Sequence, residues 1–298
     1  MDFVVSCGIF DGVHLGHQAL LRQALALGPV KLVSFDPHPL QVLRPELAHH
    51  LLFDLQDRRQ RLLQASVSEL EILPFQARWA QASAEDFVAW ILKQKPRAWI
   101  LGPDFHFGRN REGNWQWLQK RSLPGVDLVL VQTYQQNEAR VSTSLIKSVL
   151  SEGRLREAAD YLGRSYFLRG SVIRGQGLGK NLGFPTANID PSVSFRPRFG
   201  VYLTRASWRS QTYFGLTNIG QRPSVRASLQ GSPQVEVHLF DFSEDLYGEF
   251  LELEFLEFIR EERKFSNVEA LRNQIGKDVE KMKLYLHDSR GSFERPSR

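Results

Sequence analysis

The sequence has a single cysteine, Cys7, and this scarcity excludes an internal disulfide and a cysteine-based zinc cluster. Cys7 ends the apolar run Phe3-Val4-Val5-Ser6-Cys7, so we expect a buried strand thiol rather than a nucleophile. No stretch reaches the ~20 apolar residues of a membrane span, and no basic segment followed by an apolar one stands at the N-terminus. These absences predict a cytoplasmic protein without a membrane segment.

Long blocks of one charge are also missing. The formal net charge is +5 and the pI is near 9.4, which suits anionic small molecules such as nucleotides and equally a weak general affinity for nucleic acid. Because the basic residues form no long block, we expect no dedicated nucleic-acid binding. We also expect small-molecule partners and a monomer or weak homo-oligomer. With 298 residues, 42% of them hydrophobic and 24% charged, the chain can form two ordinary globular domains.

The first half alternates short apolar runs with segments of helical periodicity. The apolar runs read as buried strands and occupy residues 3–7, 30–35, 98–101 and 127–132. Apolar residues at helical spacing occupy residues 18–27, 57–65 and 84–94. Strands alternating with helices predict an α/β domain with a parallel sheet covered on both faces, and ligands of such sheets bind at the carboxyl ends of the strands.

After residue 165 the pattern changes to short strands without intervening helices. These strand-like runs are 168–173, 200–206, 212–218, 234–240 and 250–259. They predict an antiparallel β-barrel, followed by one closing amphipathic helix over 267–286 and a disordered polar tail from His287 to Arg298. Two helices, 144–150 and 155–162, bridge the halves. We therefore expect domains over 1–164 and 165–288 and a polar tail over 289–298.

The most informative stretch is Gly175-Gln176-Gly177-Leu178-Gly179-Lys180-Asn181-Leu182-Gly183-Phe184-Pro185-Thr186-Ala187-Asn188. Its glycines let the backbone approach a ligand closely, and Lys180 adds a positive charge. Thr186 and Asn188 follow the rigid Pro185 and offer a hydroxyl and an amide oxygen, which suit a magnesium ion carried by a nucleotide. The pattern is not the P-loop, which has Gly-Lys-Ser/Thr opening a helix. A flexible glycine hairpin is the alternative.

This stretch resembles the loop of riboflavin kinases in which the Pro-Thr-Ala-Asn residues hold the magnesium of ATP. The resemblance implies that Thr186 and Asn188 bind Mg²⁺. It also implies a set of nucleotide-binding residues in the same loop: Gly175, Gly179, Lys180, Gly183 and Pro185.

A second constellation, Gly8-Ile9-Phe10-Asp11-Gly12-Val13-His14-Leu15-Gly16-His17, lies where the first strand gives way to the first helix. His14 and His17 project from one side of the first helical turn, where the helix N-terminus favours phosphate. Two imidazoles there can stabilise charge on an α-phosphate as pyrophosphate departs. The alternatives are half of a metal site, for which no third ligand is evident, and capping histidines without a catalytic use.

This stretch resembles the His-x-Gly-His signature of the nucleotidyltransferase superfamily, which includes class I aminoacyl-tRNA synthetases, and its fuller form is similar to bacterial FAD synthetases. The resemblance implies a Rossmann-like sheet with His14 and His17 as catalytic residues. Nucleotide-binding residues follow from the same motif: Gly8, Phe10, Asp11, Gly12 and Gly16. Three further segments agree with that family: 35–39, 102–108 with the binding residue Asp104, and 141–147.

The last of these segments departs from the family pattern. The family reads Ser-Ser-Thr-x-x-Arg, and this chain reads Ser142-Thr143-Ser144-Leu145-Ile146-Lys147. The resemblance assigns Ser144 and Lys147 to the phosphates of ATP. Lysine keeps the charge of arginine but loses its planar fork, so we expect a working but slower adenylyltransferase.

The strand Val235-Glu236-Val237-His238-Leu239 alternates apolar and polar residues, which places Glu236 on the face opposite the valines. An ordinary solvated carboxylate is one interpretation. The strand also resembles the riboflavin kinase strand whose glutamate is the general base for the ribityl 5′-hydroxyl. Related segments imply that Asn218 and Arg260 contact the substrates, and that Phe265 packs on the flavin ring or, alternatively, is a helix-staple residue.

Over nearly its whole length the chain resembles the bacterial bifunctional riboflavin kinase/FMN adenylyltransferases. The resemblance implies ATP and riboflavin as substrates, FMN as product and substrate, FAD as product, and Mg²⁺ as cofactor. Two alternatives stay open. One is a kinase whose N-terminal half has lost adenylylation and serves as a binding module. The other is an adenylating module acting on RNA, against which stands the absence of an evident anticodon-reading domain.

Overall fold

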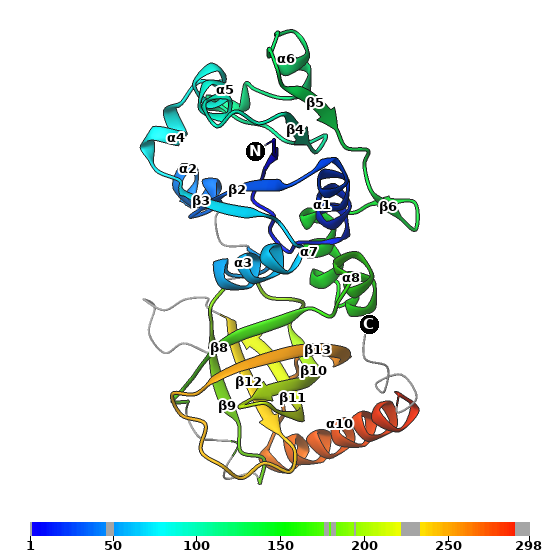
Figure 1. Cartoon of the computed structure of the whole chain (residues 1–298). Coiled ribbons are helices and arrows are strands. Elements are labelled where there is room, and N and C mark those ends of the chain that lie inside the picture. Colours follow the sequence, from blue (N-terminus) through cyan, green and yellow to red (C-terminus); the bar gives the residue numbers. More distant parts are fainter. Residues whose placement is uncertain are drawn as a thin grey trace. The chain divides into compact units, whose positions relative to one another are not determined.

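The computed structural model describes residues 2–45, 51–175, 179, 183–193, 195–221 and 233–289, and Figure 1 shows its helices and strands. The chain divides into two compact units. The first consists of Met1–Ile146, Tyr161–Gly163 and Val193–Phe195, and the second of Lys147–Asp160, Arg164–Ser192 and Arg196–Arg298. Within the described ranges, no helix has both the length and the apolar character that crossing a membrane requires.

A five-stranded parallel sheet forms the first unit, in the order β3-β2-β1-β4-β5. Its strands are β1 (Val4–Cys7), β2 (Val30–Asp36), β3 (Glu69–Pro74), β4 (Ala98–Leu101) and β5 (Asp127–Leu130). The accompanying elements are α1 (Leu15–Leu27), α2 (Pro39–Leu43), α3 (Leu55–Gln64), α4 (Ala77–Gln81), α5 (Ala84–Lys93), η2 (Arg109–Arg111), α6 (Trp115–Gln119), β6 (Gln135–Gln136) and β7 (Ala139–Arg140). The predicted α/β fold is confirmed, and the strand order reverses between β1 and β4, which is where such sheets bind ligands.

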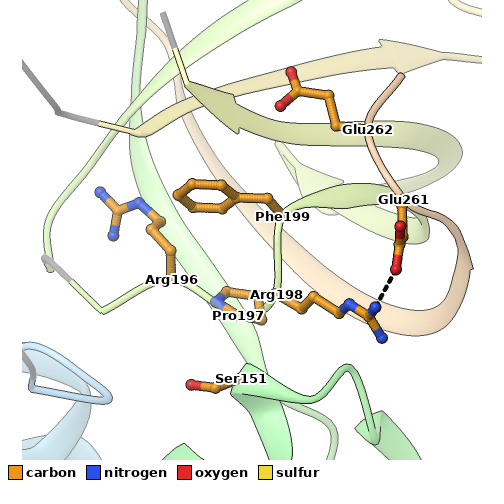
Figure 2. A pocket seen from close by; sticks show the side chains of 7 residues that line it. All are labelled: Ser151, Arg196, Pro197, Arg198, Phe199, Glu261 and Glu262. Atoms are coloured by element: carbon orange, nitrogen blue, oxygen red, sulfur yellow. Dashed lines mark hydrogen bonds and ion pairs between the residues drawn. The ribbon is translucent and has the colours of Figure 1, made fainter. Parts of the chain in front are cut away.

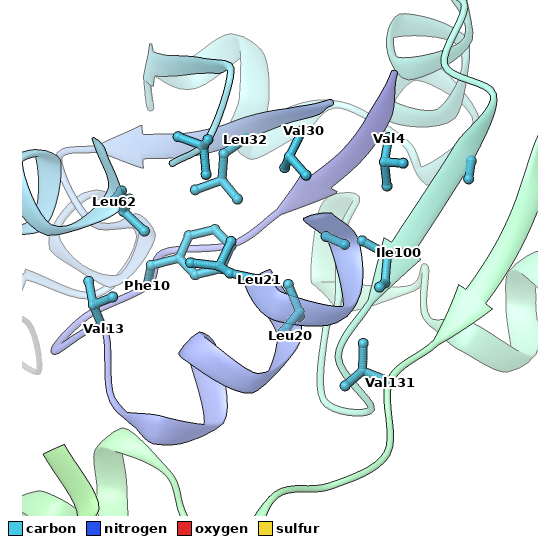
Figure 3. Packing of buried hydrophobic residues seen from close by; sticks show 13 residues of the cluster. Val4, Phe10, Val13, Leu20, Leu21, Val30, Leu32, Leu62, Ile100 and Val131 are labelled. Carbon is cyan, nitrogen blue, oxygen red and sulfur yellow. The ribbon is translucent and has the colours of Figure 1, made fainter. Parts of the chain in front are cut away.

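Apolar side chains cover both faces of this sheet because successive strand residues point to opposite sides. Val4 of β1, Leu21 of α1 and Leu62 of α3 belong to one cluster of buried residues (Figure 3), whereas Val5 belongs to the cluster of Phe87 on α5. Burial of these faces is the main source of stability. It also holds the carboxyl end of β1 in a fixed position.

Cys7 is buried, as predicted for a strand thiol. Burial raises the pKa of the thiol far above its ordinary value, and the nearby Glu71 raises it further. A nucleophilic role for Cys7 is therefore unfavourable.

The sequence pattern did not predict β3, α2, α4 or α6. β3 lies at an edge of the sheet, and its residues are half-buried or exposed. It therefore lacks the continuous apolar run by which the inner strands are recognised. The three helices have five residues each, too few to show a helical period.

The second unit is a closed antiparallel barrel in the order β10-β11-β12-β9-β8-β13. Its strands are β8 (Phe167–Ile173), β9 (Ala187–Pro191), β10 (Gly200–Trp208), β11 (Gln211–Gln221), β12 (Pro233–Leu239) and β13 (Phe250–Arg260). Among the described residues, the further helices are α7 (Thr143–Ser151), α8 (Leu155–Leu162) and α10 (Val268–Ser289). The predicted barrel and closing helix are confirmed, and β9 is an additional strand.

The closing helix α10 packs on the barrel through Met282, which clusters with Leu203 and Leu256. Asn267 caps its start, because its Oδ1 accepts the backbone N–H of Ala270 at 2.8 Å. The prediction that the disordered tail begins at His287 was wrong, since α10 continues to Ser289. No glycine or proline interrupts the helix there, so its hydrogen-bond ladder can continue. Residues 290–298 lie outside the described residues.

Candidate active sites

The junction of β1 and α1 carries the predicted histidine pair. Between strand and helix the backbone turns through positive φ at Phe10 (55°), Gly12 (85°) and Val13 (39°). His14 is the N-cap of α1, and its Nδ1 accepts the backbone N–H of His17 at 3.3 Å. The turn thus brings both imidazoles to a helix N-terminus, where unpaired N–H groups favour an anion.

The rings of His14 and His17 stack, with centroids 3.7 Å apart and planes inclined by 20°. Phe10 meets the His17 ring edge-on at 5.2 Å and belongs to the buried core. Burial lowers the pKa of His17 well below its ordinary 6.5, and the adjacent His14 lowers it further. Near neutral pH His17 is therefore uncharged, and its ring can donate one hydrogen bond and accept another.

Gly16 lets two motif segments come together. A Cβ at this position would lie 3.2 Å from the carbonyl oxygen of Val141 and 3.1 Å from the His14 ring. A Cβ on Gly8 would similarly lie 3.0 Å from the Phe10 ring. Side chains at these positions would therefore crowd the histidine turn against the segment that precedes α7.

The start of α7 lies against the same turn. Thr143 Oγ1 donates to the carbonyl of Asp11 at 3.1 Å, and Ser142 Oγ accepts a backbone N–H of the first helical turn at 3.2 Å. Two of the three hydroxyls in this motif therefore hold the segment in place, whereas the Ser144 side chain is exposed. Lys147 follows on α7 and belongs to the second unit.

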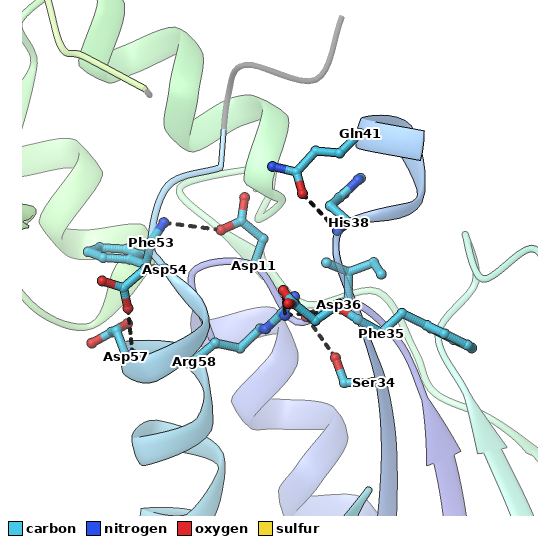
Figure 4. Close-up of polar contacts among 11 residues, drawn as sticks. Asp11, Ser34, Phe35, Asp36, His38, Gln41, Phe53, Asp54, Asp57 and Arg58 are labelled. Atoms are coloured by element: carbon cyan, nitrogen blue, oxygen red, sulfur yellow. Dashed lines mark hydrogen bonds and ion pairs between the residues drawn. The ribbon is translucent and has the colours of Figure 1, made fainter. Parts of the chain in front are cut away.

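Asp11 is a buried anchor (Figure 4). Both carboxylate oxygens accept the backbone N–H of Leu52 at 3.1 Å, and Oδ1 also accepts that of Phe53 at 3.3 Å. These bonds tie the segment before α3 to the turn after β1. A direct contact between Asp11 and nucleotide stays a prediction.

Arg58 of α3 is a site residue that the sequence analysis missed. It is 3% exposed, and its guanidinium donates to the carbonyls of Ile9 at 3.1 Å and Phe35 at 3.0 Å and to Asp36 at 3.3 Å. Burial lowers the pKa of Arg58, and the carboxylates of Asp36 and Asp11 oppose that shift. Arg58 thus joins the ends of β1 and β2. The sequence does not distinguish it from its exposed neighbour Arg59.

Asp104 lies in the turn after β4 and pairs with Arg140 of β7. His106 Nδ1 lies 2.7 Å from the Asp104 carbonyl and 3.1 Å from a guanidinium nitrogen of Arg111. Burial lowers the pKa of His106, and the Arg111 charge contributes. Since β4 neighbours β1, these groups and the histidine turn both follow carboxyl ends of adjacent strands.

In the second unit, the predicted phosphate loop is described only in part, and Lys180 lies outside the described residues. Phe184 N donates to the carbonyl of Gly179 at 3.0 Å. A Cβ on Gly175 would lie 1.9 Å from Asn188 Nδ2. Only glycine therefore lets the backbone at position 175 approach the predicted metal ligand so closely.

The Pro-Thr-Ala-Asn segment is fastened to β12. His238 Nδ1 lies 2.8 Å from the carbonyl oxygen of Pro185, and its ring meets Phe184 edge-on at 5.4 Å. Gly183 turns the chain into this segment with a φ of 82°. The contact places the segment beside the strand that carries Glu236.

Three predicted site residues lie in a row across neighbouring strands. Asn188 of β9 is the register partner of Glu236 on β12, and Glu236 is the partner of Asn218 on β11. Directly opposite residues project from the same face of a sheet. Val235 and Val237 are 0% and 1% exposed, so the predicted alternation is present and the row lies on the outer face of the barrel.

Gln234 joins two members of this row and was missed by the sequence analysis. It stands two residues before Glu236 and therefore on the same face of β12. Its Nε2 donates to Glu236 Oε1 and to Asn188 Oδ1. A glutamine in a strand has no distinctive sequence signal, and only the pairing of β12 with β9 gives it this position.

Oxygen donors at the start of β9 suit a particular kind of metal. Thr186 and Asn188 are two residues apart and supply a hydroxyl and an amide oxygen, the hard ligands that Mg²⁺ prefers. Throughout the described ranges, no group of three His, Cys, Asp or Glu side chains could hold a metal ion. A hydroxyl and an amide oxygen fit a magnesium ion that takes its other ligands from water and phosphate oxygens.

Arg260, at the end of β13, is directed to α10. Its Nε lies 2.8 and 3.1 Å from the two carboxylate oxygens of Asp278, and the two side chains are 9% and 1% exposed. Its guanidinium carbon lies 5.7 Å from the centroid of the Phe265 ring. The ion pair fastens α10 to the barrel, and contacts of Arg260 and Phe265 with flavin stay predictions.

A cavity of about 440 Å³ opens beside Glu261, the residue that follows Arg260 in the sequence (Figure 2). It is lined by Ser151, Arg196, Pro197, Arg198, Phe199, Glu261 and Glu262. Val201 of β10 is the register partner of both Arg260 and Asn218. The cavity and the Asn188–Glu236–Asn218 row therefore lie at the same end of the barrel.

Both halves of the chain match family models: residues 1–145 match FAD synthetase and residues 162–286 match riboflavin kinase. The bifunctional riboflavin kinase/FMN adenylyltransferase of Bacillus subtilis (strain 168) is 31% identical over 96% of this chain and 93% of its own length. That of Escherichia coli (strain K12) is 34% identical over 92% and 90%. A crystal structure described as a macrolide-efflux protein from Streptococcus pneumoniae superposes with a TM-score of 0.82 at 29% identity, covering 95% of this chain and 94% of that one.

A nucleotidyltransferase-like sheet and a kinase-like barrel in one chain define a two-domain enzyme of flavin nucleotide synthesis. The chain belongs to the family of bifunctional riboflavin kinase/FMN adenylyltransferases.

Proposed function

We propose that the barrel phosphorylates riboflavin with Mg-ATP to give FMN, and that the N-terminal unit transfers AMP from a second ATP to FMN, giving FAD and pyrophosphate. The row in which Asn188 lies opposite Glu236 is the observation that carries the kinase half. For the adenylyltransferase half it is the stacked His14–His17 pair at the N-terminus of α1.

In the kinase reaction, Glu236 accepts the proton of the ribityl 5′-hydroxyl. The freed oxygen bonds to the γ-phosphorus of ATP while the bond from that phosphorus to the β,γ-bridging oxygen breaks, so that ADP leaves. A positioned base of this kind contributes about 10²–10⁴-fold. The register places Glu236 on the outer face of the barrel, at the same end as the cavity.

Thr186 Oγ1 and Asn188 Oδ1 would hold a magnesium ion. When bound with ATP, the ion neutralises phosphate charge and orients the γ-phosphate. Gly175 borders Asn188 and Gly179 borders Thr186. The glycine loop is proposed to hold the phosphates, with Lys180 as the counter-charge.

In the adenylyl transfer, a phosphate oxygen of FMN bonds to the α-phosphorus of ATP and the bond to the β-phosphate breaks. His14 and His17 stabilise the charge on the departing pyrophosphate by hydrogen bonding at the start of α1. Ser144 and Lys147 are proposed to bind the same phosphates. The hydrogen bond from Thr143 to the Asp11 carbonyl holds the start of their helix against the histidine turn.

A second candidate is a kinase whose N-terminal unit no longer adenylylates FMN. Lys147 in place of the family arginine is the observation that favours it. The intact histidine pair and the FAD synthetase match over residues 1–145 favour the bifunctional enzyme.

Product analysis tests the proposal. Purified protein is incubated with Mg-ATP and either riboflavin or FMN, and the flavins are separated by chromatography. We expect FMN and FAD from riboflavin and FAD from FMN. FMN without any FAD would establish the kinase-only candidate, and no product from either substrate would overturn both assignments.

We further propose that the enzyme works in the cytoplasm as a monomer or weak homo-oligomer on small molecules, without nucleic acid. The modest net charge of +5 and the absence of a long basic block support the last point. Light scattering over a concentration series tests the oligomeric state.

A further inference from the structure

Gln234 holds two side chains that the proposed kinase reaction uses. Its amide nitrogen carries two hydrogens, and each one has an acceptor: Oε1 of Glu236 and Oδ1 of Asn188. A primary amide is the only uncharged side-chain group that donates two hydrogen bonds from one planar nitrogen. The two acceptors are thereby set at a fixed separation.

The backbone supports the same arrangement. Glu236 and Asn188 are direct register partners, and Gln234 stands on the same face of β12. Across from Gln234 on β11 is Gly220, and a Cβ there would lie 2.0 Å from Oε1 of Glu262, so the Glu262 carboxylate occupies the place of a side chain at this position. Strand pairing therefore brings the three polar groups together before any ligand binds.

Neither hydrogen bond prevents the proposed role of its acceptor, which is proton uptake for Glu236 and cation binding for Asn188. A carboxylate has about four lone-pair sites, so Glu236 can accept the Gln234 bond at Oε1 and still take up the substrate proton. A carbonyl oxygen has two lone pairs, so Asn188 Oδ1 can accept from Gln234 and still bind a cation. Partners that orient metal ligands in this way typically change metal affinity or activity 10–100-fold when they are removed.

We infer that Gln234 is a positioning residue of the kinase site, which aligns the base Glu236 with the metal ligand Asn188. The inference rests on the proposed function. It assigns Gln234 no contact with substrate. Its loss should therefore lower kcat for FMN formation and weaken the binding of Mg²⁺, with little effect on the KM for riboflavin.

Two substitutions separate positioning from packing. Gln234→Leu removes both N–H donors. Gln234→Glu keeps the shape of the side chain but replaces the donating nitrogen by a carboxylate oxygen, which cannot donate to Glu236 or Asn188. The matched control is Gln211→Leu, because Gln211 starts β11 and lies at the other end of the barrel, where Trp208 is its register partner. FAD formation from added FMN serves as an internal control in every variant.

Two measurements are made on the full-length protein. The first is steady-state FMN formation over a riboflavin series. The second is riboflavin fluorescence polarisation at fixed ADP over a Mg²⁺ titration, which reports binding without turnover. For both Gln234 variants we expect kcat to fall about 10–100-fold and the Mg²⁺ midpoint to rise about tenfold. The KM for riboflavin, FAD formation and the Gln211→Leu control should stay near wild type.

A Gln234→Leu protein with wild-type kcat and Mg²⁺ midpoint would overturn the inference. So would an increase in the KM for riboflavin alone, because that would indicate a substrate contact. If Gln234→Leu does not fold, as judged by its melting temperature, the isosteric Gln234→Glu decides by the same criteria. A wild-type protein that forms no FMN would overturn the proposed function together with the inference. If the wild type forms FMN and the Gln234 variants have its kcat and Mg²⁺ midpoint, the inference alone is overturned.

Discussion

Asn188 of β9 and Glu236 of β12 lie directly opposite each other in the closed barrel. The proposed metal ligand and the proposed base, far apart in the sequence, are thus placed by the backbone hydrogen bonds of two paired strands. A sheet holds such groups more rigidly than a loop does, and a rigid arrangement of reacting groups favours catalysis.

Arg58 should be important for the stability of the first unit. Arg58→Met keeps most of the apolar length but removes this donor from the carbonyl of Phe35 and from that of Ile9, which retains the 3.3 Å bond from Ser34 Oγ. A buried acceptor that loses its partner costs about 1–3 kcal/mol. We expect the free energy of unfolding to fall by that amount in urea titrations, and FAD formation to fall because the Ile9 carbonyl precedes the histidine turn.

Arg59→Met is the matched control, because Arg59 is the next residue of α3 and its side chain is exposed. We expect its unfolding midpoint and its FAD formation to match wild type. If Arg58→Met were as stable and active as this control, Arg58 would have no anchoring role.

His17 should make the first unit less stable in mild acid. Its folded pKa lies well below 6.5, so below pH 6.5 the unfolded chain binds a proton that the folded chain does not. The free energy of unfolding is therefore unaffected by this proton above pH 6.5. It decreases as the pH falls from 6.5 toward the folded pKa, by up to about 1.4 kcal/mol per pH unit. His17→Gln should flatten this dependence.

Tryptophan fluorescence can follow that unfolding, because Trp79, Trp90, Trp99, Trp115 and Trp117 belong to the first unit. Urea titrations at pH 7.5, 6.5 and 5.5 compare wild type with His17→Gln and with the exposed His287→Gln on α10. Equal losses in all three proteins would contradict the assignment to His17.

Lys147 should limit the adenylyl transfer. Lys147→Arg restores the planar fork that binds phosphate at two points, so we expect FAD formation from FMN to rise several-fold. FMN formation from riboflavin, measured in the same preparation, should not change. An unchanged or lower rate of FAD formation would mean that the lysine is not the limiting feature.

Much of the fold could be predicted because buried strands leave a local pattern. The runs that became β1, β4 and β12 stand out by their apolar content or their alternation. β9 does not, because Ala187–Pro191 contains polar residues and a proline and coincides with a binding motif. Arg58 and Gln234 could not be found from the sequence, since their roles depend on which strand ends or strands lie beside them.

Among the motif residues too, positions set by a local turn could be predicted from the sequence, whereas contacts made by packing of distant segments could not. The His14–His17 spacing predicted that both rings would lie together, since the local turn determines it. Arg260 also carried a motif, yet its guanidinium is paired with Asp278 of α10. A sequence motif identifies the residue type, whereas the choice between a ligand contact and an ion pair depends on packing of distant segments.

Glu236→Gln tests the central claim most directly, because it removes the proposed base without changing the shape of the side chain. The rates to measure are FMN formation from riboflavin and FAD formation from FMN in one preparation, beside Glu252→Gln, whose carboxylate pairs with Arg169 on the barrel at 2.6 Å. We predict that FMN formation falls by about 10²–10⁴-fold in Glu236→Gln alone, while FAD formation stays at the wild-type rate in both variants. FMN formation at the wild-type rate in Glu236→Gln would contradict the account.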